Sequence, residues 1–330
     1  MPAERESIMY EKIRSIVAAD FAAVNDFIVE QLHSDVPLVE NIGHYIIDAG
    51  GKRLRPLLVL LSARGCGIAH TNEHVRLAAV IEFIHTATLL HDDVVDMSAM
   101  RRGRPTANSN WNNPSSVLVG DFIYSRSFQI LVALGNMRIM QIIADTTNKI
   151  AEGEVLQLLN KHNVDITEAS YLGVIRDKTA ILFQAAAQCG AILAAADKDQ
   201  ELALRAYGMH VGMAFQLIDD VLDYAGDSGT LGKNVGDDLA EGKPTLPLIY
   251  AMGHGSDTDS RLIRNSLKTS GRDSLERIIQ IVNACGALDY TRQLAAAEVQ
   301  SAKACLTALP ASPYRDTLEQ LAELAITRNL

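Results

Sequence analysis

The chain lacks the features that mark several broad classes of protein. Its four cysteines lie far apart and include no C-x-x-C pair, which argues against a zinc knuckle or a disulfide scaffold. No apolar run reaches the roughly 18 residues of a membrane span. The nearest run, 185–196, is interrupted by Gln188, and the charged first residues lack the apolar core of a signal peptide. We therefore expect reduced thiols, a cytoplasmic protein and no integral membrane segment.

Long basic runs are missing as well. The chain has 40 acidic and 30 basic residues and a formal net charge of −10, which argues against a nucleic-acid-binding surface. What is present suits a large core, because 48% of the 330 residues are hydrophobic and the mean hydropathy is +0.07. No linker and no repeat of fixed period divides the sequence. We expect one domain over residues 1–330.

Proline is absent between Ser115 and Lys243, and this stretch is rich in Ala, Leu, Ile and Gln at helical spacing. No segment shows the alternating pattern of a strand series, so the sequence predicts an all-α fold. Thr71 and Thr167 stand at expected N-caps. The expected irregular segments are 97–114 and 226–243. Helices are expected over residues 10–32, 36–47, 55–64, 73–96, 115–134, 137–159, 168–176, 179–195 and 200–223.

One acidic motif occurs twice, because residues 92–96 (DDVVD) and 219–223 (DDVLD) both read D-D-x-x-D inside apolar stretches. Residues four apart share a helix face, so the first and last carboxylates of each motif point the same way. Like charges at this spacing repel, which calls for a compensating cation. Carboxylate oxygens suit magnesium, which usually shares its coordination shell with substrate phosphates. The pattern fits two magnesium sites for a diphosphate, and it also fits two solvated helix ends.

Basic residues form short sets of their own. Residues 50–56 (GGKRLRP) place three cations at the start of a helix, where backbone N–H groups and the helix dipole also favour an anion. Arg101 and Arg102 follow the first acidic motif, and Lys178 is expected to open another helix. Lys233 and Lys243 follow the second motif. Each cation alone reads as surface charge, but together with the acidic motifs they fit an enzyme that grips diphosphates.

The sequence resembles the trans-isoprenyl diphosphate synthases, and within that family the bacterial octaprenyl diphosphate synthases. The resemblance implies a single large helical bundle around a deep central cavity. Motif order and spacing are kept across the matching blocks, and weaker likeness continues to the end. The matching blocks are GGKRLRP (50–56), EFIHTATLLHDDVVDMSAMRRG (82–103), VGDFIYSRSFQ (119–129), AEGEVLQL (151–158), KTAILFQAAAQCG (178–190) and FQLIDDVLDYAGDSGTLGKNVGDDLAEGKPTLPLIYA (215–251).

The resemblance also implies roles for individual residues. Magnesium on an allylic diphosphate is expected at Asp92 and Asp96, with Asp93 supporting. A further magnesium is expected at Asp219, with Asp220 and Asp223 close to it. The diphosphate of isopentenyl diphosphate is expected to bind Lys52, Arg55, His85 and Arg102. The allylic diphosphate and its ionisation are assigned to Arg101, Lys178, Thr179, Gln216 and Lys233. Lys243, Asp237 and Asp238 are weaker candidates.

The expected reaction needs Mg²⁺, for which Mn²⁺ could substitute. The metal and the cations stabilise the charge that develops as the allylic C–O bond breaks. The double bond of isopentenyl diphosphate attacks the allylic cation, and a proton then leaves to the departing diphosphate. The expected activity is repeated condensation on an allylic primer, most simply farnesyl diphosphate, to a long all-trans product for a quinone side chain. The resemblance also implies a homodimer.

Residues just before the first acidic motif bear on the product length. The growing tail is expected to run past Ala87 and Thr88, where short-chain members of the family carry aromatic residues. Small side chains leave the path open, which predicts an octaprenyl or nonaprenyl product. Leu131 and Ile143 are candidates for the floor of the cavity and are equally compatible with ordinary core positions.

Other functions remain open from the sequence. A shorter-chain prenyl diphosphate synthase is the nearest alternative. A carboxylate-bridged di-iron bundle would use two E-x-x-H pairs, which occur at 30–33 and 82–85, but it leaves both acidic motifs without a role. A non-catalytic subunit of a heteromeric synthase is expected to have lost one or both acidic motifs, whereas both are intact here.

Overall fold

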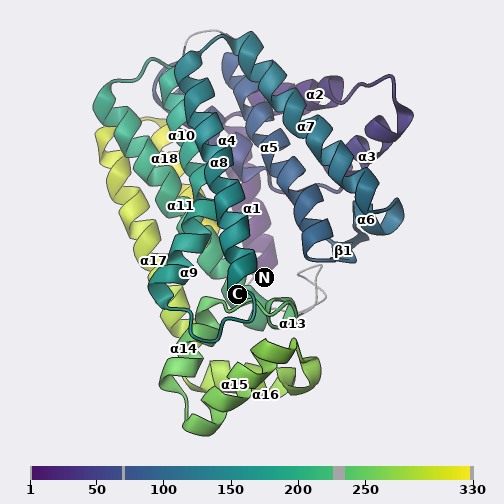
Figure 1. The fold of residues 1–330 in the computed structure, drawn as a ribbon. Helices are drawn as coiled ribbons and strands as arrows, with labels where there is room; N and C mark the ends of the chain where they lie inside the picture. The colour runs from purple at the N-terminus through teal and green to yellow at the C-terminus, as the bar shows by residue number, and fades with distance from the viewer. Residues whose placement is uncertain (1, 69–70, 226–234, 328–330) are drawn as a thin grey trace.

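The computed structural model describes residues 2–68, 71–225 and 235–327. Within these ranges nearly every element is a helix, and the only strands form one two-stranded antiparallel hairpin. The predicted all-α class is confirmed. Figure 1 shows the long helices side by side in a bundle, with a smaller group of helices, α14 to α16, below it.

The first half of the chain contributes the helices that carry the first acidic motif and the basic loops beside it. Its elements are α1 (Pro2–Ser15), α2 (Ala18–Gln31), α3 (Pro37–Asp48), α4 (Leu54–Gly65), α5 (Glu73–Val95), β1 (Met100–Arg101), β2 (Arg104–Pro105), α6 (Ala107–Asn110), α7 (Asn113–Leu134) and α8 (Met137–Asn160).

The second half carries the second acidic motif on its longest helix. Its elements are α9 (Glu168–Ile175), the π-helical turn η1 (Arg176–Ala180), α10 (Ile181–Leu193), α11 (Lys198–Ala225), α13 (Asp237–Ala240), α14 (Leu246–His254), α15 (Asp257–Thr269), the 3₁₀ turn η2 (Arg272–Ser274), α16 (Leu275–Ala284), α17 (Ala287–Cys305), the 3₁₀ turn η3 (Leu306–Ala308) and α18 (Pro313–Ile326).

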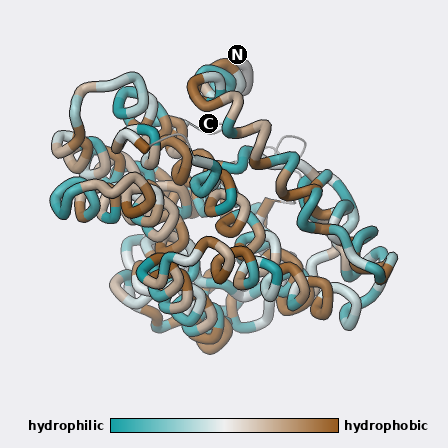
Figure 2. The backbone as a smooth tube through the Cα atoms, turned by 90° about the horizontal axis from the view of Figure 1, so that it is seen from above, coloured by the Kyte–Doolittle hydropathy of each residue, from teal (hydrophilic) through white to brown (hydrophobic). Residues whose placement is uncertain are grey.

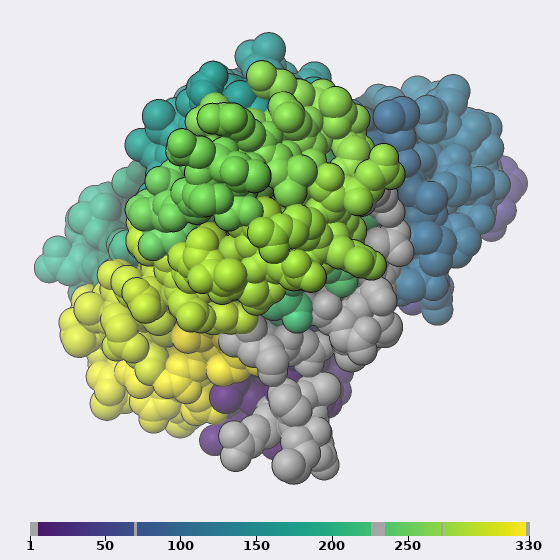
Figure 3. Space-filling model, turned by 90° about the horizontal axis from the view of Figure 1, so that it is seen from below, coloured from purple at the N-terminus to yellow at the C-terminus, as the bar shows by residue number. Residues whose placement is uncertain are grey.

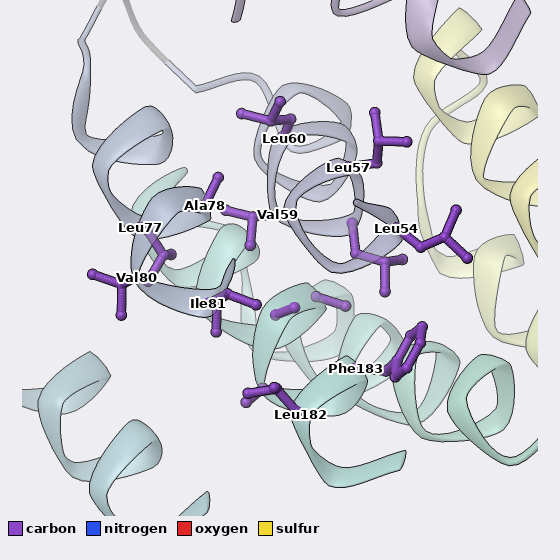
Figure 4. Packing of buried hydrophobic residues seen from close by; sticks show 14 of the residues in the cluster. Leu54, Leu57, Val59, Leu60, Leu77, Ala78, Val80, Ile81, Leu182 and Phe183 are labelled. Atoms are coloured by element: carbon purple, nitrogen blue, oxygen red, sulfur yellow. The ribbon is translucent and has the colours of Figure 1, made fainter. Parts of the chain in front are cut away.

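Helix α4 lies at the centre of the bundle. Apart from Arg55, Ser62 and Arg64, its sequence LRPLLVLLSARG is apolar, and such a helix is stable only when neighbours cover most of its surface. Helices α2, α5, α10 and α18 supply that cover. Figure 4 shows Leu57 and Val59 of α4 among side chains of α5 and α10, including Ile81 and Phe183. This core fixes α5 and α10, which carry or adjoin the candidate site.

The view from above looks down the bundle and shows hydrophilic and hydrophobic residues alternating along its helices (Figure 2). A second apolar cluster lies at the lower end, where Val221 and Tyr224 of α11 pack with residues of α14, α15 and α16. These helices cover much of the molecule when it is seen from below (Figure 3). The lower cluster therefore anchors the C-terminal end of α11, which bears the second acidic motif.

Helix α7 is long and apolar enough to cross a membrane, and in the described ranges it alone meets that criterion. The sequence analysis expected no such segment. The most apolar 18-residue window of α7 is 39% buried, and the helix packs along α5. One such helix is weak evidence for a membrane span, because helices of soluble bundles pass the same test of length and composition.

Three predicted boundaries are wrong. The helix expected over 10–32 is two helices, because the chain turns at the β-branched Ile16 and Val17. The helix start expected at Lys178 does not exist, because a π-helical turn joins α9 to α10 without a break. The N-cap of α5 is Asn72 and not Thr71, whose hydroxyl accepts from the Glu73 N–H. The predicted cap at Thr167 is confirmed.

Candidate functional site

Both acidic motifs lie in the last turns of their helices, at the end of the bundle that faces α13. The helix dipole is negative there, so carboxylates at these positions are unfavourable without nearby cations or hydrogen-bond donors. Asp92 and Asp96 of the first motif and Asp219 and Asp220 of the second line one cavity of about 410 Å³. Two segments more than a hundred residues apart in sequence therefore form opposite parts of one polar site.

Most residues that the sequence singles out meet in this cavity. Besides the four aspartates, its lining includes Arg55, His85, Thr88, Arg101, Arg102, Lys178, Thr179, Gln216, Asp237, Asp238 and Lys243. Lys52, Asp93 and Asp223 do not line it. Lys233 lies outside the described residues.

Every carboxylate of the first motif has a basic partner. The Arg101 guanidinium donates to Asp93 at 2.8 Å, and the Lys178 ammonium lies 3.8 Å from Asp92. Asp96 accepts from two lysine side chains, one on each carboxylate oxygen. Burial raises the pKa of Asp93, and its bond to Arg101 only partly offsets this. These contacts supply the compensating charge that the spacing of the motif requires.

The partners of the second motif are different. The Tyr171 hydroxyl donates to one Asp220 oxygen, and the Gln216 amide donates to the other at 2.8 Å. The Thr179 hydroxyl donates to the Gln216 carbonyl oxygen at 3.1 Å, which extends the chain of hydrogen bonds to the cavity wall. Burial and the nearby Asp238 charge raise the pKa of Asp220 to about 8. Asp220 is thereby suited to holding Gln216 and Thr179 in place.

The hairpin β1–β2 aims Arg102 into the site. Arg102 and Gly103 are the two central residues of its turn, and both have positive φ, as in a type I′ turn. A non-glycine residue in this conformation is strained, which is common at functional sites. The Arg102 guanidinium rests on the backbone of Gly51, so the hairpin and the GGKRLRP loop meet. The segment expected to be irregular thus contains a defined turn.

Two basic residues of the GGKRLRP loop contact side chains of α10 and α1. The helix expected at residue 55 begins at Leu54, with Arg53 as its N-cap in a left-handed conformation. Arg55 lies over the Phe183 ring, 4.3 Å from the centroid, as in a cation–π contact. Lys52 forms an ion pair with Glu6 of α1. Helix α1 therefore reaches the back of this loop.

His85 lies on α5 and lines the cavity near Arg55 and Arg102. Burial and the charges of Arg55 and Arg102 hold the pKa of His85 well below its ordinary value of 6.5. The imidazole is therefore neutral, which leaves one ring N–H as a donor and the other nitrogen as an acceptor. One turn earlier, burial raises the pKa of Glu82, although Arg53 lies 4.0 Å from it.

The π-helical turn η1 presents Lys178 and Thr179 together. Such a turn adds one residue to a helical turn and is frequent at functional sites. Lys178 donates to Glu154 at 2.6 Å and to Gln157 at 2.7 Å, both on α8. Burial and the Asp92 charge raise the pKa of Glu154 to about 7. The turn therefore couples α8 to the first acidic motif through one ammonium group.

The candidate chain-length residues are divided between the cavity and the core. Thr88 lines the cavity, whereas Ala87 is buried one position away and does not line it. Leu131 and Ile143 are fully packed in the main apolar cluster. Apolar side chains of Leu89, Ile150 and Leu182 form part of the lining.

Sequence reasoning missed Glu154 and Gln157, which share one face of α8, and Lys161, the residue that follows the last turn of α8. A signal for Glu154 and Gln157 exists, because residues three apart lie on one side of a helix. The intervening apolar residues Val155 and Leu159 are 56% and 73% exposed. The last turns of α8 are thus inverted, with polar groups inward and apolar groups outward. Tyr171 was also missed, and a single tyrosine carries no such signal.

The donor set fits magnesium better than iron. No cluster of three His, Cys, Asp or Glu residues is preassembled as a metal site within the described ranges. Magnesium needs no such cluster, because one or two carboxylates and the oxygens of a bound diphosphate complete its shell. Asp92, Asp96 and Asp219 offer hard oxygen ligands on one cavity. The di-iron alternative gains no support, since His33 pairs with Glu40 at an exposed position.

Comparison with known proteins agrees with this geometry. A family model described as polyprenyl synthetase matches residues 36–285. The chain is 53% identical to the octaprenyl diphosphate synthase of Escherichia coli, over 97% of this chain and 99% of that protein. It is 50% identical to the all-trans-nonaprenyl-diphosphate synthase (geranyl-diphosphate specific) of Rhodobacter capsulatus, over 96% and 98% of the two chains.

A solved structure agrees in fold over nearly the whole chain. The polyprenyl synthase of Caulobacter crescentus, complexed with calcium and isoprenyl diphosphate, superposes with a TM-score of 0.94 and 43% identity, covering 97% of this chain and 98% of that one. The chain belongs to the polyprenyl synthetase family, whose members are magnesium-dependent trans-prenyltransferases.

Proposed function

We propose that this enzyme condenses isopentenyl diphosphate repeatedly with an allylic diphosphate, most simply farnesyl diphosphate, to an all-trans octaprenyl or nonaprenyl diphosphate for a quinone side chain. The observation that carries the proposal is one cavity lined by both acidic motifs and by two separate sets of cations. The octaprenyl and nonaprenyl synthases at about half identity support the product class. The whole of residues 1–330 is proposed to serve this one activity as a single domain.

The allylic diphosphate is proposed to lie between the acidic motifs. Asp92, Asp96 and Asp219 would hold Mg²⁺ there, with Asp223 behind them, and Mn²⁺ would substitute. The metal supplies Lewis-acid stabilisation of the leaving diphosphate. Lys178 and Arg101 add positive charge to this site, and the resemblance assigns Lys233 to the same diphosphate. Asp93 supports this site through its bond to Arg101, and Asp220 does so through Gln216.

The diphosphate of isopentenyl diphosphate is proposed to bind the second set of cations. Arg102 and Arg55 line the cavity next to the neutral His85, and Lys52 belongs to the same GGKRLRP loop as Arg55. The Arg102 guanidinium can offer paired N–H donors to phosphate oxygens. These cations sit on the GGKRLRP loop and on the turn of the hairpin, whereas Lys178 sits on η1 between α9 and α10. Two anions can therefore be held apart while their carbon chains meet.

The carbon chemistry needs a dry cavity and oxygen dipoles. The Thr179 hydroxyl and the Gln216 carbonyl oxygen, which are hydrogen-bonded to each other, are proposed to stabilise the allylic cation, and Tyr171 and Asp220 hold Gln216 in place. The released proton is proposed to go to the departing diphosphate. The product tail is proposed to pass Thr88 toward the apolar interior, with Ala87, Leu131 and Ile143 as limits to its length.

A homodimer is part of the proposal. The outer side of α7 leaves large apolar residues in water, including Leu118 and Val132 at 67% and 69% exposure. The Tyr124 and Phe128 rings contact each other at a tilt of 45° on the same helix, beside Val132. Contiguous apolar patches of this kind mark protein–protein contacts. We expect sedimentation equilibrium to give twice the 35.8 kDa chain mass, and Leu118→Glu to shift it toward the monomer.

The test of the proposed function is product analysis. The purified protein is incubated with isopentenyl diphosphate, Mg²⁺ and either geranyl or farnesyl diphosphate, and the product is measured by mass spectrometry. We expect a main product of eight or nine isoprene units from the preferred primer. A product that stops at three or four units would establish a shorter-chain synthase, and no elongation of either primer would overturn the proposal.

A further inference from the structure

Two lysines hold Asp96, and only one of them was expected near the site. The Lys161 ammonium donates to one carboxylate oxygen at 2.9 Å, and the Lys243 ammonium donates to the other at 2.6 Å. All three side chains are between 13% and 16% exposed. We call Lys161 and Lys243 the lysine clamp. It places two positive charges on one carboxylate that is a proposed magnesium ligand.

The backbone builds the clamp as one unit. His162, next to Lys161, has a φ of +63° and donates its backbone N–H to the Gly242 carbonyl, next to Lys243, at 2.8 Å. Its ring donates to the Leu267 carbonyl of α15 at 2.8 Å. Gly242 has a φ of +69°, and a Cβ there would lie 2.4 Å from the His162 ring. This close approach ties the loop of one lysine to the loop of the other.

The two lysines differ in what else holds them. Lys243 also pairs with Glu241 at 2.5 Å. Among the described residues, the contacts of the Lys161 ammonium are with Asp96 alone. A divalent cation bound to Asp96 would repel both ammonium groups, because all three charges would surround one carboxylate. Moving the Lys161 ammonium away from Asp96 therefore costs less free energy than moving the Lys243 ammonium, which would also disturb the pair with Glu241.

We propose that Lys161 is a diphosphate ligand that occupies Asp96 until the metal arrives with its diphosphate. The inference rests on the proposed function. In the loaded site the Lys161 ammonium moves from the Asp96 oxygen to an oxygen of the diphosphate, and Lys243 keeps its bond to Glu241. Lys161 thus opposes binding of the metal alone and favours binding of metal and diphosphate together. It makes the two ligands cooperative.

The test measures metal binding without turnover. Free Mn²⁺ is titrated by its electron paramagnetic resonance signal against the full-length protein, with and without inorganic pyrophosphate. We expect Lys161→Met to bind Mn²⁺ alone about three- to tenfold more tightly. The factor corresponds to the loss of one charge-assisted hydrogen bond, from Lys161 to Asp96, which is partly made up by the remaining bond from Lys243. We also expect pyrophosphate to enhance Mn²⁺ binding less in this variant, by a similar factor.

Two further variants sharpen the test. Lys149→Met removes the same charge from the exposed side of α8, where Lys149 pairs with Glu152, and should leave both affinities unchanged. Gly242→Ala displaces the His162 ring and should shift both affinities in the direction of Lys161→Met while every charge remains. Circular dichroism verifies that each variant is folded.

Some results would overturn the inference without touching the proposed function. Lys161→Met with unchanged or weaker Mn²⁺ binding, in a folded protein that still elongates farnesyl diphosphate, would show that Lys161 does not compete with the metal. The same holds if Lys149→Met shifts the affinities equally. Failure of the proposed function is a different result, namely no elongation by the wild-type protein whatever its affinity for Mn²⁺.

Discussion

The contact between the Arg102 guanidinium and the Gly51 backbone offers a sharp test of the isopentenyl diphosphate site. A Cβ added at Gly51 would lie 2.7 Å from three atoms of that guanidinium, and the φ of +134° is one that side chains rarely adopt. The guanidinium is the end of a flexible side chain, so it should move while the core helix α4 stays. Gly51→Ala should therefore displace Arg102 from the cavity without unfolding the protein.

The size of the effect follows from the contact that is lost. A charge-assisted hydrogen bond to a phosphate is worth about 1.5–3 kcal/mol, which corresponds to about a 10- to 150-fold change in affinity. We expect the KM for isopentenyl diphosphate to rise by about that factor in Gly51→Ala, while the KM for farnesyl diphosphate changes little. Strain at the positive φ should in addition lower the free energy of unfolding by about 1 kcal/mol.

Gly50→Ala is the matched control. Gly50 also has a positive φ, of +76°, but an added Cβ would meet no atom within 4 Å. It should share the loss of stability and keep the native KM for isopentenyl diphosphate. Initial rates with each substrate varied in turn, and urea denaturation of both variants, separate the two effects. A native KM in Gly51→Ala, or an equal rise in Gly50→Ala, would refute the reasoning.

Three further predictions concern the product, the pH dependence and the stability. Thr88→Phe should place a ring in the cavity and shift the product measured by mass spectrometry to fewer isoprene units, and an unchanged product distribution would mean that the tail takes another route. Burial raises the pKa of Glu154 from 4.5 to about 7, so the folded protein takes up a proton there. In EDTA, the free energy of unfolding of the wild-type protein should then fall relative to that of Glu154→Gln as the pH rises from 4.5 to 7. A difference between the two proteins that stays constant with pH would contradict this. Glu201 is buried and accepts from Arg138 and Gln188, so Glu201→Ala should lower the free energy of unfolding by about 1–3 kcal/mol in urea, whereas Glu152→Ala should not change it.

The fold could be predicted from local patterns to a large extent. The absence of proline over 115–243 and the apolar periodicity predicted the long helices of that stretch, and α7 and α8 agree with the prediction within two residues. The turn at Ile16 and Val17 was missed because the residues on both sides of it favour a helix. The π-helical turn at Lys178 was missed because no residue type marks it.

The site could be predicted only where its residues form compact motifs. Two copies of D-D-x-x-D and the GGKRLRP loop are visible as strings, and the cavity brings them together. The lysine clamp is not visible in this way, because Asp96 and its partners Lys161 and Lys243 lie 65 and 147 residues apart. Such contacts depend on the tertiary packing of α8 and the loop before α14. The sequence shows that Lys161 and Lys243 carry positive charge, but it does not show that both pair with Asp96.

The central claim is that both acidic motifs act on one substrate in one cavity. The direct measurement is mass spectrometry of the products made by the wild-type protein and by Asp219→Asn from farnesyl diphosphate and isopentenyl diphosphate, with Mg²⁺ and with EDTA. The wild-type protein with Mg²⁺ should give a series of polyprenyl diphosphates one isoprene unit apart, ending at eight or nine units. EDTA should abolish the series, and Asp219→Asn should slow it by about 100- to 1,000-fold, the cost of losing one group that stabilises transition-state charge. A folded Asp219→Asn that elongates at the native rate would contradict the account.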